Sequence, residues 1–92
     1  MKSKEKEKRN MGQFHYVIKD EVGIHARPAG MLVKLVKGAG CEVTVTKGEK
    51  TVDASKLIAV MGLGAKKGDE IVVSSESDEV LMKVKEFLEA NL

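Results

Sequence analysis

The sequence is poor in the features that mark secreted and membrane proteins. One cysteine, Cys41, stands among 92 residues, so no internal disulfide can form. No apolar run approaches the ~20 residues that a helix needs to span a bilayer. The charged first ten residues also lack the apolar stretch of a secretory signal. We therefore expect a cytoplasmic protein that does not insert into a membrane.

Aromatic residues and ligand clusters are also scarce. The chain has one Tyr, two Phe and no Trp, while 42% of its residues are hydrophobic. This length and composition suit one compact domain with a small aliphatic core. The sequence contains neither a clustered set of metal ligands nor a glycine loop of the phosphate-binding kind, so we expect no metal and no cofactor.

The basic residues are concentrated at the start of the chain. Residues 1–10 hold five of the 16 basic and two of the 14 acidic side chains, which leaves eleven basic and twelve acidic ones. This near balance of charge in the body argues against a face that binds nucleic acid, because such binding needs a concentrated basic patch. We interpret residues 1–10 as a charged, disordered extension and residues 11–92 as the domain. A nucleic-acid-binding arm is the alternative, and it predicts salt-dependent binding that disappears when residues 1–10 are removed.

The first half of the domain shows a strand pattern followed by a helix pattern. Apolar and polar residues alternate from Phe14 onward, which predicts a half-buried strand. Apolar residues then recur at helical spacing over residues 29–36. Pro28 suits the first turn of this helix, where its missing N–H breaks no bond. The helix is therefore expected to begin close to His25 and to stop at the glycines of residues 38–40.

The second half predicts a hairpin, a short helix, a strand and a final helix. Residues 41–53 alternate around a turn at Lys47-Gly48-Glu49. Residues 55–64 carry more apolar side chains than one short helix can bury. Residues 70–75 alternate again, and Ser77 caps a helix with one apolar stripe. The order β-α-β-β-α-β-α predicts an α+β fold, a four-stranded antiparallel sheet with three helices on one face.

The segment GIHARPA, residues 23–29, carries the chemistry. It places the imidazole of His25 and the guanidinium of Arg27 at a helix N-terminus. A neutral imidazole can attack a phosphoryl group, and helix amides and a guanidinium can hold its oxygens. The other histidine, His15, falls on the solvent face of the first strand, and we assign it no function.

GIHARPA, the amphipathic helix, the hairpin and the later VMGLGAKKGDEI resemble HPr, the histidine-containing phosphocarrier protein of the bacterial phosphotransferase system. The resemblance covers the chain from Gly12 onward. It implies an open-faced β-sandwich with strand order 1-4-2-3 and three helices on one face. It further implies that the protein is a stoichiometric phosphoryl carrier, not an enzyme, and a monomer.

The resemblance also implies the partners and the site. Enzyme I, charged by phosphoenolpyruvate, would phosphorylate Nδ1 of His25, which would pass the group to the IIA domain of a sugar permease. Arg27 matches the phosphate-stabilising arginine, and the backbone amides of Ala26 and Arg27 would complete the site. Leu57, Ile58 and Met61 align with the helix through which the family docks its partners. Core packing is an equally good interpretation for Leu57.

One position departs from the family pattern. HPr kinase of many Gram-positive bacteria phosphorylates a serine that aligns with Lys56 here, while Ser55 lies one residue earlier. A shift of one position turns a helical side chain by about 100°. Ser55 is therefore a candidate for regulatory phosphorylation, but we favour its interpretation as a plain helix cap.

An alternative function keeps the fold and changes the task. HPr-like proteins bound by transcription regulators act by docking, and the same fold could serve such a regulatory module. Intact His25 and Arg27 weigh against this alternative, as does Lys56 at the serine position.

Overall fold

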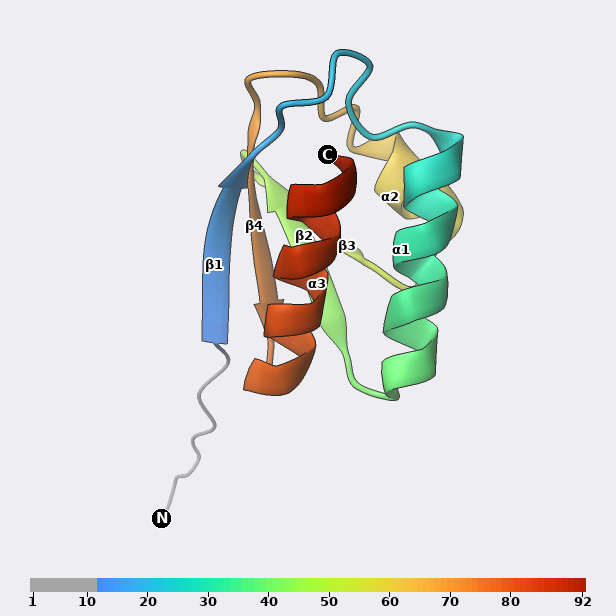
Figure 1. The fold of residues 1–92 in the computed structure, drawn as a ribbon, viewed down its shortest axis with the longest axis vertical. Coiled ribbons are helices and arrows are strands. Elements are labelled where there is room, and N and C mark those ends of the chain that lie inside the picture. Colours follow the sequence, from blue (N-terminus) through green and yellow to red (C-terminus); the bar gives the residue numbers. More distant parts are fainter. Residues whose placement is uncertain (1–11) are drawn as a thin grey trace.

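The computed structural model describes residues 12–92, and its elements follow the predicted order. The interpretation of residues 1–10 as a disordered arm lies outside the described residues. Figure 1 shows the arrangement of these elements: β1 (Gly12–Val17), α1 (Ala26–Ala39), β2 (Val43–Lys47), β3 (Lys50–Asp53), α2 (Leu57–Gly62), β4 (Glu70–Ser75) and α3 (Asp78–Asn91).

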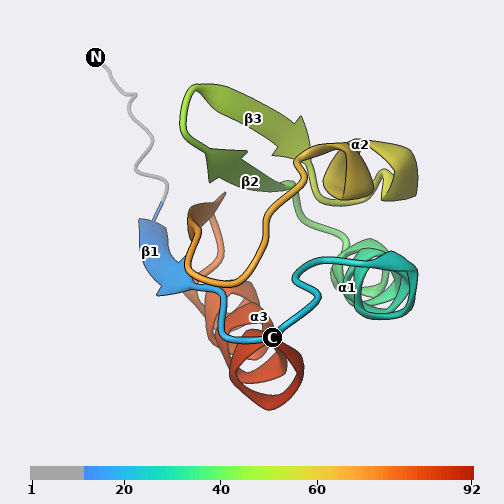
Figure 2. The ribbon, with the colours of Figure 1, turned by 90° about the horizontal axis from the view of Figure 1, so that it is seen from above.

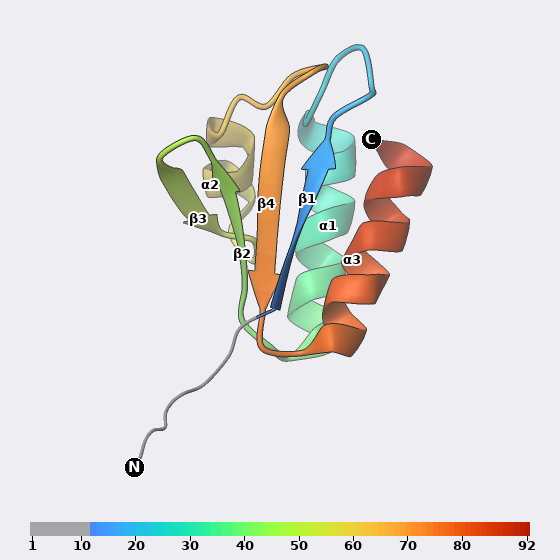
Figure 3. The same cartoon turned by 90° about the vertical axis from the view of Figure 1, so that its left-hand side faces the viewer.

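The four strands form one antiparallel sheet in the order β1-β4-β2-β3, as predicted. β4, the last strand along the chain, lies between β1 and β2 (Figure 3). On the core side, Val73 of β4 pairs with Phe14 of β1 and with Val45 of β2. Val45 in turn pairs with Val52 of β3. One row of apolar side chains therefore crosses the whole sheet.

All three helices cover the same face of the sheet (Figure 2). The strand residues beneath them are buried aliphatics, and Val43, Val45 and Val73 are each 0% exposed. Val36 of α1 and Val84 of α3 close the core from the helix side. Because burying one such side chain is worth roughly 1.5–3 kcal/mol, this single layer of contacts supplies most of the stability. The fold is an open-faced α+β sandwich.

The ends of the helices match local signals in the sequence. His25 is the N-cap of α1, with extended backbone, and Gly40 ends the helix in the left-handed conformation, with φ 74°. Gly38 lies inside α1 and does not stop it. Ser77 caps α3 by accepting a hydrogen bond from the Val80 N–H at 3.3 Å. No helix among residues 12–92 is long and apolar enough to cross a membrane.

Two predicted boundaries are wrong by one or two residues. β2 begins at Val43, so Cys41 precedes the strand and packs half-buried against the core. The N-cap of α2 is Lys56, in extended conformation and without a side-chain cap bond. Ser55 is therefore not the cap of α2.

Backbone hydrogen bonds join the loop between β1 and α1 to the loop before β4. Ile24 N–H donates to the Ala65 carbonyl at 2.9 Å, and Gly68 N–H donates to the Ile18 carbonyl at 2.8 Å. Gly23 lies at this crossing with φ +84°, and a Cβ there would meet the Ala65 carbonyl oxygen and lie 2.7 Å from Lys66 Cα. Only glycine fits both the conformation and the space.

Gly23→Ala should therefore lower the free energy of unfolding by about 1–3 kcal/mol, because it combines a left-handed backbone with a clash against backbone atoms. The matched control is Gly38→Ala in α1, where a Cβ meets nothing within 4 Å. That change should stabilise by roughly 0.5–1 kcal/mol. Urea denaturation measures both, and a Gly23→Ala protein as stable as the wild type would contradict the packing described here.

Candidate functional site

His25 presents its imidazole at the N-terminus of α1. Its backbone is extended, its carbonyl accepts a hydrogen bond from Ala29 N–H at 2.9 Å, and its side chain makes no cap hydrogen bond. The side chain is 43% exposed. The fold therefore fixes the backbone of His25 and leaves the ring open to solvent, as a nucleophile requires.

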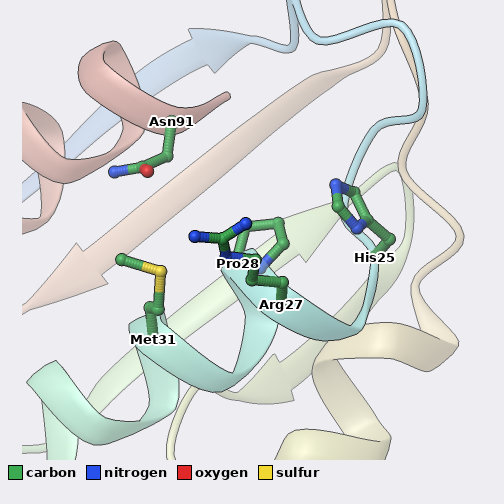
Figure 4. Close-up of a pocket in the computed structure, with 5 residues that line it drawn as sticks. All are labelled: His25, Arg27, Pro28, Met31 and Asn91. Atoms are coloured by element: carbon green, nitrogen blue, oxygen red, sulfur yellow. The ribbon is translucent and has the colours of Figure 1, made fainter.

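A hollow of about 330 Å³ lies beside the imidazole, between the start of α1 and the end of α3. In Figure 4 the His25 ring stands at one end of the hollow, and the Arg27 guanidinium extends across Pro28 toward Asn91. This volume is ample for a phosphoryl group. The five residues that line it are His25, Arg27, Pro28, Met31 and Asn91.

The first turn of α1 is prepared to receive an anion. No acceptor within residues 12–92 takes the amide hydrogens of Ala26 and Arg27, and Pro28 has no amide hydrogen. The first turn contains no acidic residue that would occupy these donors. With the positive end of the helix dipole behind them, the two amides are suited to hold an anion next to His25, and their role in phosphate binding stays a prediction.

Arg27 is exposed and available at the same place. Among the described residues, no carboxylate lies within ion-pair distance of its guanidinium. A guanidinium offers planar, paired donors that suit phosphate oxygens. The two residues selected from the motif, His25 and Arg27, therefore line one hollow, together with the two free amides.

Asp20 is a neighbour of His25 that sequence reasoning missed. Its Oδ2 atom lies 3.9 Å from Nε2 of His25. The same oxygen accepts hydrogen bonds from the N–H groups of Val22, at 3.0 Å, and Gly23, at 3.1 Å. The sequence feature that could have pointed to Asp20 is an Asp three residues before a glycine, a spacing that favours an Asx turn. The sequence alone does not reveal that this turn faces the imidazole.

α2 carries an exposed apolar surface beside α1, made of Leu57, Ile58 and Met61. Their exposed fractions are 39%, 80% and 37%, whereas Val60 of the same helix is 0% exposed. Leu57 is therefore not a fully buried core residue. Met31 of α1, 45% exposed, adds apolar area at the hollow itself. A contact role for this surface remains a prediction.

The hydroxyl of Ser55 is engaged with a carboxylate. Ser55 Oγ donates to Asp53 Oδ1 at 2.7 Å, and Ser55 N–H donates to the same oxygen at 2.8 Å. These two bonds, the side-chain one first, hold the pKa of Asp53 below its ordinary value. A phosphate on Ser55 would lose the hydroxyl donor and face this carboxylate, so the local geometry disfavours the modification.

Ser55→Ala should raise the pKa of Asp53 toward its ordinary value, because the hydroxyl bond to the carboxylate is lost while the amide bond remains. The hydrogen bonds to the ionised Asp53 carboxylate stabilise the folded protein fully at pH values above the ordinary pKa of Asp. This stabilisation is lost as the pH falls through the lowered pKa of Asp53 in the folded protein.

A carboxyl-detected NMR titration of both proteins measures the change. Asp69 is the internal control, because the Lys66 amide and then Lys47 lower its pKa independently of Ser55. An Asp53 titration that does not move in the variant would contradict the assignment.

His15, the second histidine, lies on the opposite face of the sheet from the helices. Its side chain is 56% exposed, as predicted, and Nδ1 lies 3.3 Å from Oε2 of Glu70 on the neighbouring strand. It lies on a strand and not at the start of a helix, so its surroundings differ from those of His25.

The fold and the similarity to known proteins place this chain among the small phosphocarrier proteins. A family model described as "PTS HPr component phosphorylation site" matches residues 13–90. The chain therefore belongs to the HPr family of the phosphotransferase system.

Individual relatives agree with this assignment. Phosphocarrier protein HPr of Chlamydia pneumoniae is 38% identical over 73 residues, which are 76% of this chain and 68% of the relative. The solved histidine-containing phosphocarrier protein of Mycoplasma superposes with a TM-score of 0.82 at 28% identity, covering 86% of this chain and 93% of that one. Another similar structure, an HPr dimer from Thermoanaerobacter tengcongensis, has a TM-score of 0.64 at 31% identity over 82% and 90% of the two chains. The expectation of a monomer therefore stays a prediction.

Proposed function

We propose that this chain accepts a phosphoryl group on Nδ1 of His25 from phosphorylated enzyme I and delivers it to the IIA domains of sugar permeases. The observation that carries the proposal is the position of His25, an open imidazole at the start of α1 beside two amides with free hydrogens. The chain acts in stoichiometric amounts, as a cytoplasmic monomer, and the transfer uses no metal or cofactor.

The transfer follows from the groups around the hollow. The lone pair of the imidazole attacks phosphorus while the bond to the donor breaks, and three phosphoryl oxygens must then be held. The amides of Ala26 and Arg27 receive two of them at the positive end of α1. The Arg27 guanidinium points toward Asn91 in the structure (Figure 4). Because Arg27 and His25 line the same hollow, a turn of this side chain toward His25 brings the guanidinium to the phosphoryl oxygens.

The apolar surface of α2 supplies the contact with both partners. Ile58 is 80% exposed, and covering its apolar surface with a partner lowers the free energy of the complex. Met61 adds a flexible side chain that can adapt to different surfaces, which suits a protein with two partners. We leave regulation at Ser55 by HPr kinase out of the proposal, because its hydroxyl is bound to Asp53.

Arg27→Ala should slow phosphoryl transfer from enzyme I at least tenfold, because a donor to the phosphoryl oxygens is lost while the nucleophile remains. The transfer rate of Arg27→Lys should lie between those of the wild type and Arg27→Ala, since an ammonium keeps the charge but lacks the paired donors of a guanidinium. Rapid-quench assays with phosphoenolpyruvate and enzyme I measure the rate. His25→Ala is the control and should take no phosphate, and wild-type rates for Arg27→Ala would remove the role given to this guanidinium.

Ile58→Glu should raise the KM of enzyme I for this carrier severalfold and leave the fold intact, because the side chain is exposed and supports no core contact. The matched control is Met82→Glu on α3, which is also a large exposed apolar residue, at 64%. If both variants change KM equally, or neither does, the docking surface on α2 is misassigned.

A further inference from the structure

We propose that Asp20 is a positioning residue for His25, whose carboxylate keeps the imidazole proton on Nε2 and so leaves the lone pair on Nδ1 as the nucleophile. The use of this lone pair rests on the proposed function, whereas the position of the proton is a property of the unphosphorylated protein.

The backbone of Asp20 is held in place on two sides. Its N–H donates to the Leu92 carbonyl at the end of α3, at 2.9 Å, and its carbonyl accepts from Gly23 N–H at 3.1 Å. The carboxylate is held by the Val22 and Gly23 amides, and the side chain is only 34% exposed. The position of the negative charge is thus fixed before any phosphoryl donor arrives.

The carboxylate faces one particular nitrogen of the ring. Nε2 of His25 is 3.9 Å from Oδ2 of Asp20, which is within ion-pair distance but too long for a hydrogen bond. A neutral imidazole has one N–H and one lone pair, and a carboxylate only accepts. The tautomer with the proton on Nε2 is therefore favoured, and a rotation of the exposed imidazole toward the fixed carboxylate completes the hydrogen bond, as in other sites before substrate binds.

The same arrangement supports the reaction step. Nδ1 forms a bond to phosphorus as the bond from phosphorus to the donor breaks, and the electron pair of that broken bond stays with the donor. The proton stays on Nε2, so the ring of His25 becomes positively charged. Asp20 stabilises this developing charge without moving a proton, as the carboxylate of a catalytic triad does.

Other charged groups near the site do not substitute for Asp20. Glu21, on the same loop, is 84% exposed and pairs with Lys67 at 3.0 Å. Arg27 on α1 is cationic, and α3 contributes Asn91, which is neutral. Among the described residues, Asp20 is the carboxylate within ion-pair distance of His25.

The test compares Asp20→Asn with the wild type. The amide oxygen of Asn can still accept from Val22 and Gly23, so the turn is kept and the charge is lost. The control is Glu21→Gln, which removes a charge from the same loop. Asp20→Ser also offers a neutral acceptor to the turn, so it provides a second variant if Asp20→Asn fails to fold.

Long-range ¹H–¹⁵N spectra of histidine-labelled protein, recorded where both imidazoles are neutral, give the proton position directly. We expect the proton of His25 on Nε2 in the wild type, and a two- to fivefold larger share on Nδ1 in Asp20→Asn, from a charge about 4 Å away in a solvent-exposed setting. His15 is the internal reference and should not change. A wild-type proton on Nδ1, an unchanged Asp20→Asn spectrum, or an equal effect of Glu21→Gln would overturn the proposal.

A second readout separates this proposal from the proposed function. With phosphoenolpyruvate and enzyme I, Asp20→Asn should be phosphorylated two- to fivefold more slowly than the wild type and Glu21→Gln. Phosphorylation of the wild type with no effect of Asp20→Asn contradicts the role of Asp20 and leaves the carrier function standing. A wild type that takes no phosphate refutes the carrier function, while the spectra still decide where Asp20 holds the proton.

Discussion

The site depends on one constraint, the clamp that holds the loop before α1 between two distant parts of the chain. Gly23 packs so closely against the backbone of Ala65 that no side chain fits there, and the Ile24 N–H donates a hydrogen bond to the Ala65 carbonyl. On the other side, Lys19 and Asp20 donate to the carbonyl of Leu92. These contacts fix where α1 begins, and hence the imidazole, the free amides and the carboxylate relative to one another. The sheet forms a rigid base for the helices. His25 follows a loop that is held in place by its contacts with Ala65 and Leu92.

Most of the fold could be predicted because its signals are local. The strands alternate buried and exposed residues since one face of the sheet is covered, and helix ends at Gly40 and Ser77 follow from left-handed backbone and side-chain capping. The strand order came from resemblance to a family, because pairing between distant strands leaves no trace in periodicity. The start of α2 was misplaced at Ser55, because a serine before an apolar run reads as a cap, while here the hydroxyl is bound to Asp53.

The sequence allowed prediction of those candidate site residues that lie close together in the chain. It did not allow prediction of the residues that only the fold brings to the same place. His25, Arg27 and the helix terminus lie within one short segment, so their chemistry could be inferred together. Asn91 reaches the hollow from the last turn of α3, and only the packing of that helix beside α1 reveals it. Asp20 is near in sequence, but a turn residue has a structural interpretation of its own. Its second role becomes visible only from the 3.9 Å distance to Nε2 of His25.

The most direct test of the central claim is to find the phosphoryl group. The full chain, labelled with ¹⁵N-histidine, would be incubated with phosphoenolpyruvate and enzyme I, and then examined by intact mass and by ³¹P–¹⁵N correlation NMR. The account predicts one acid-labile phosphate per chain, bonded to Nδ1 of His25, with His15 unmodified. A folded protein that takes no phosphate, while an HPr known to be active is phosphorylated in the same mixture, would contradict it, as would a phosphate on any residue other than His25.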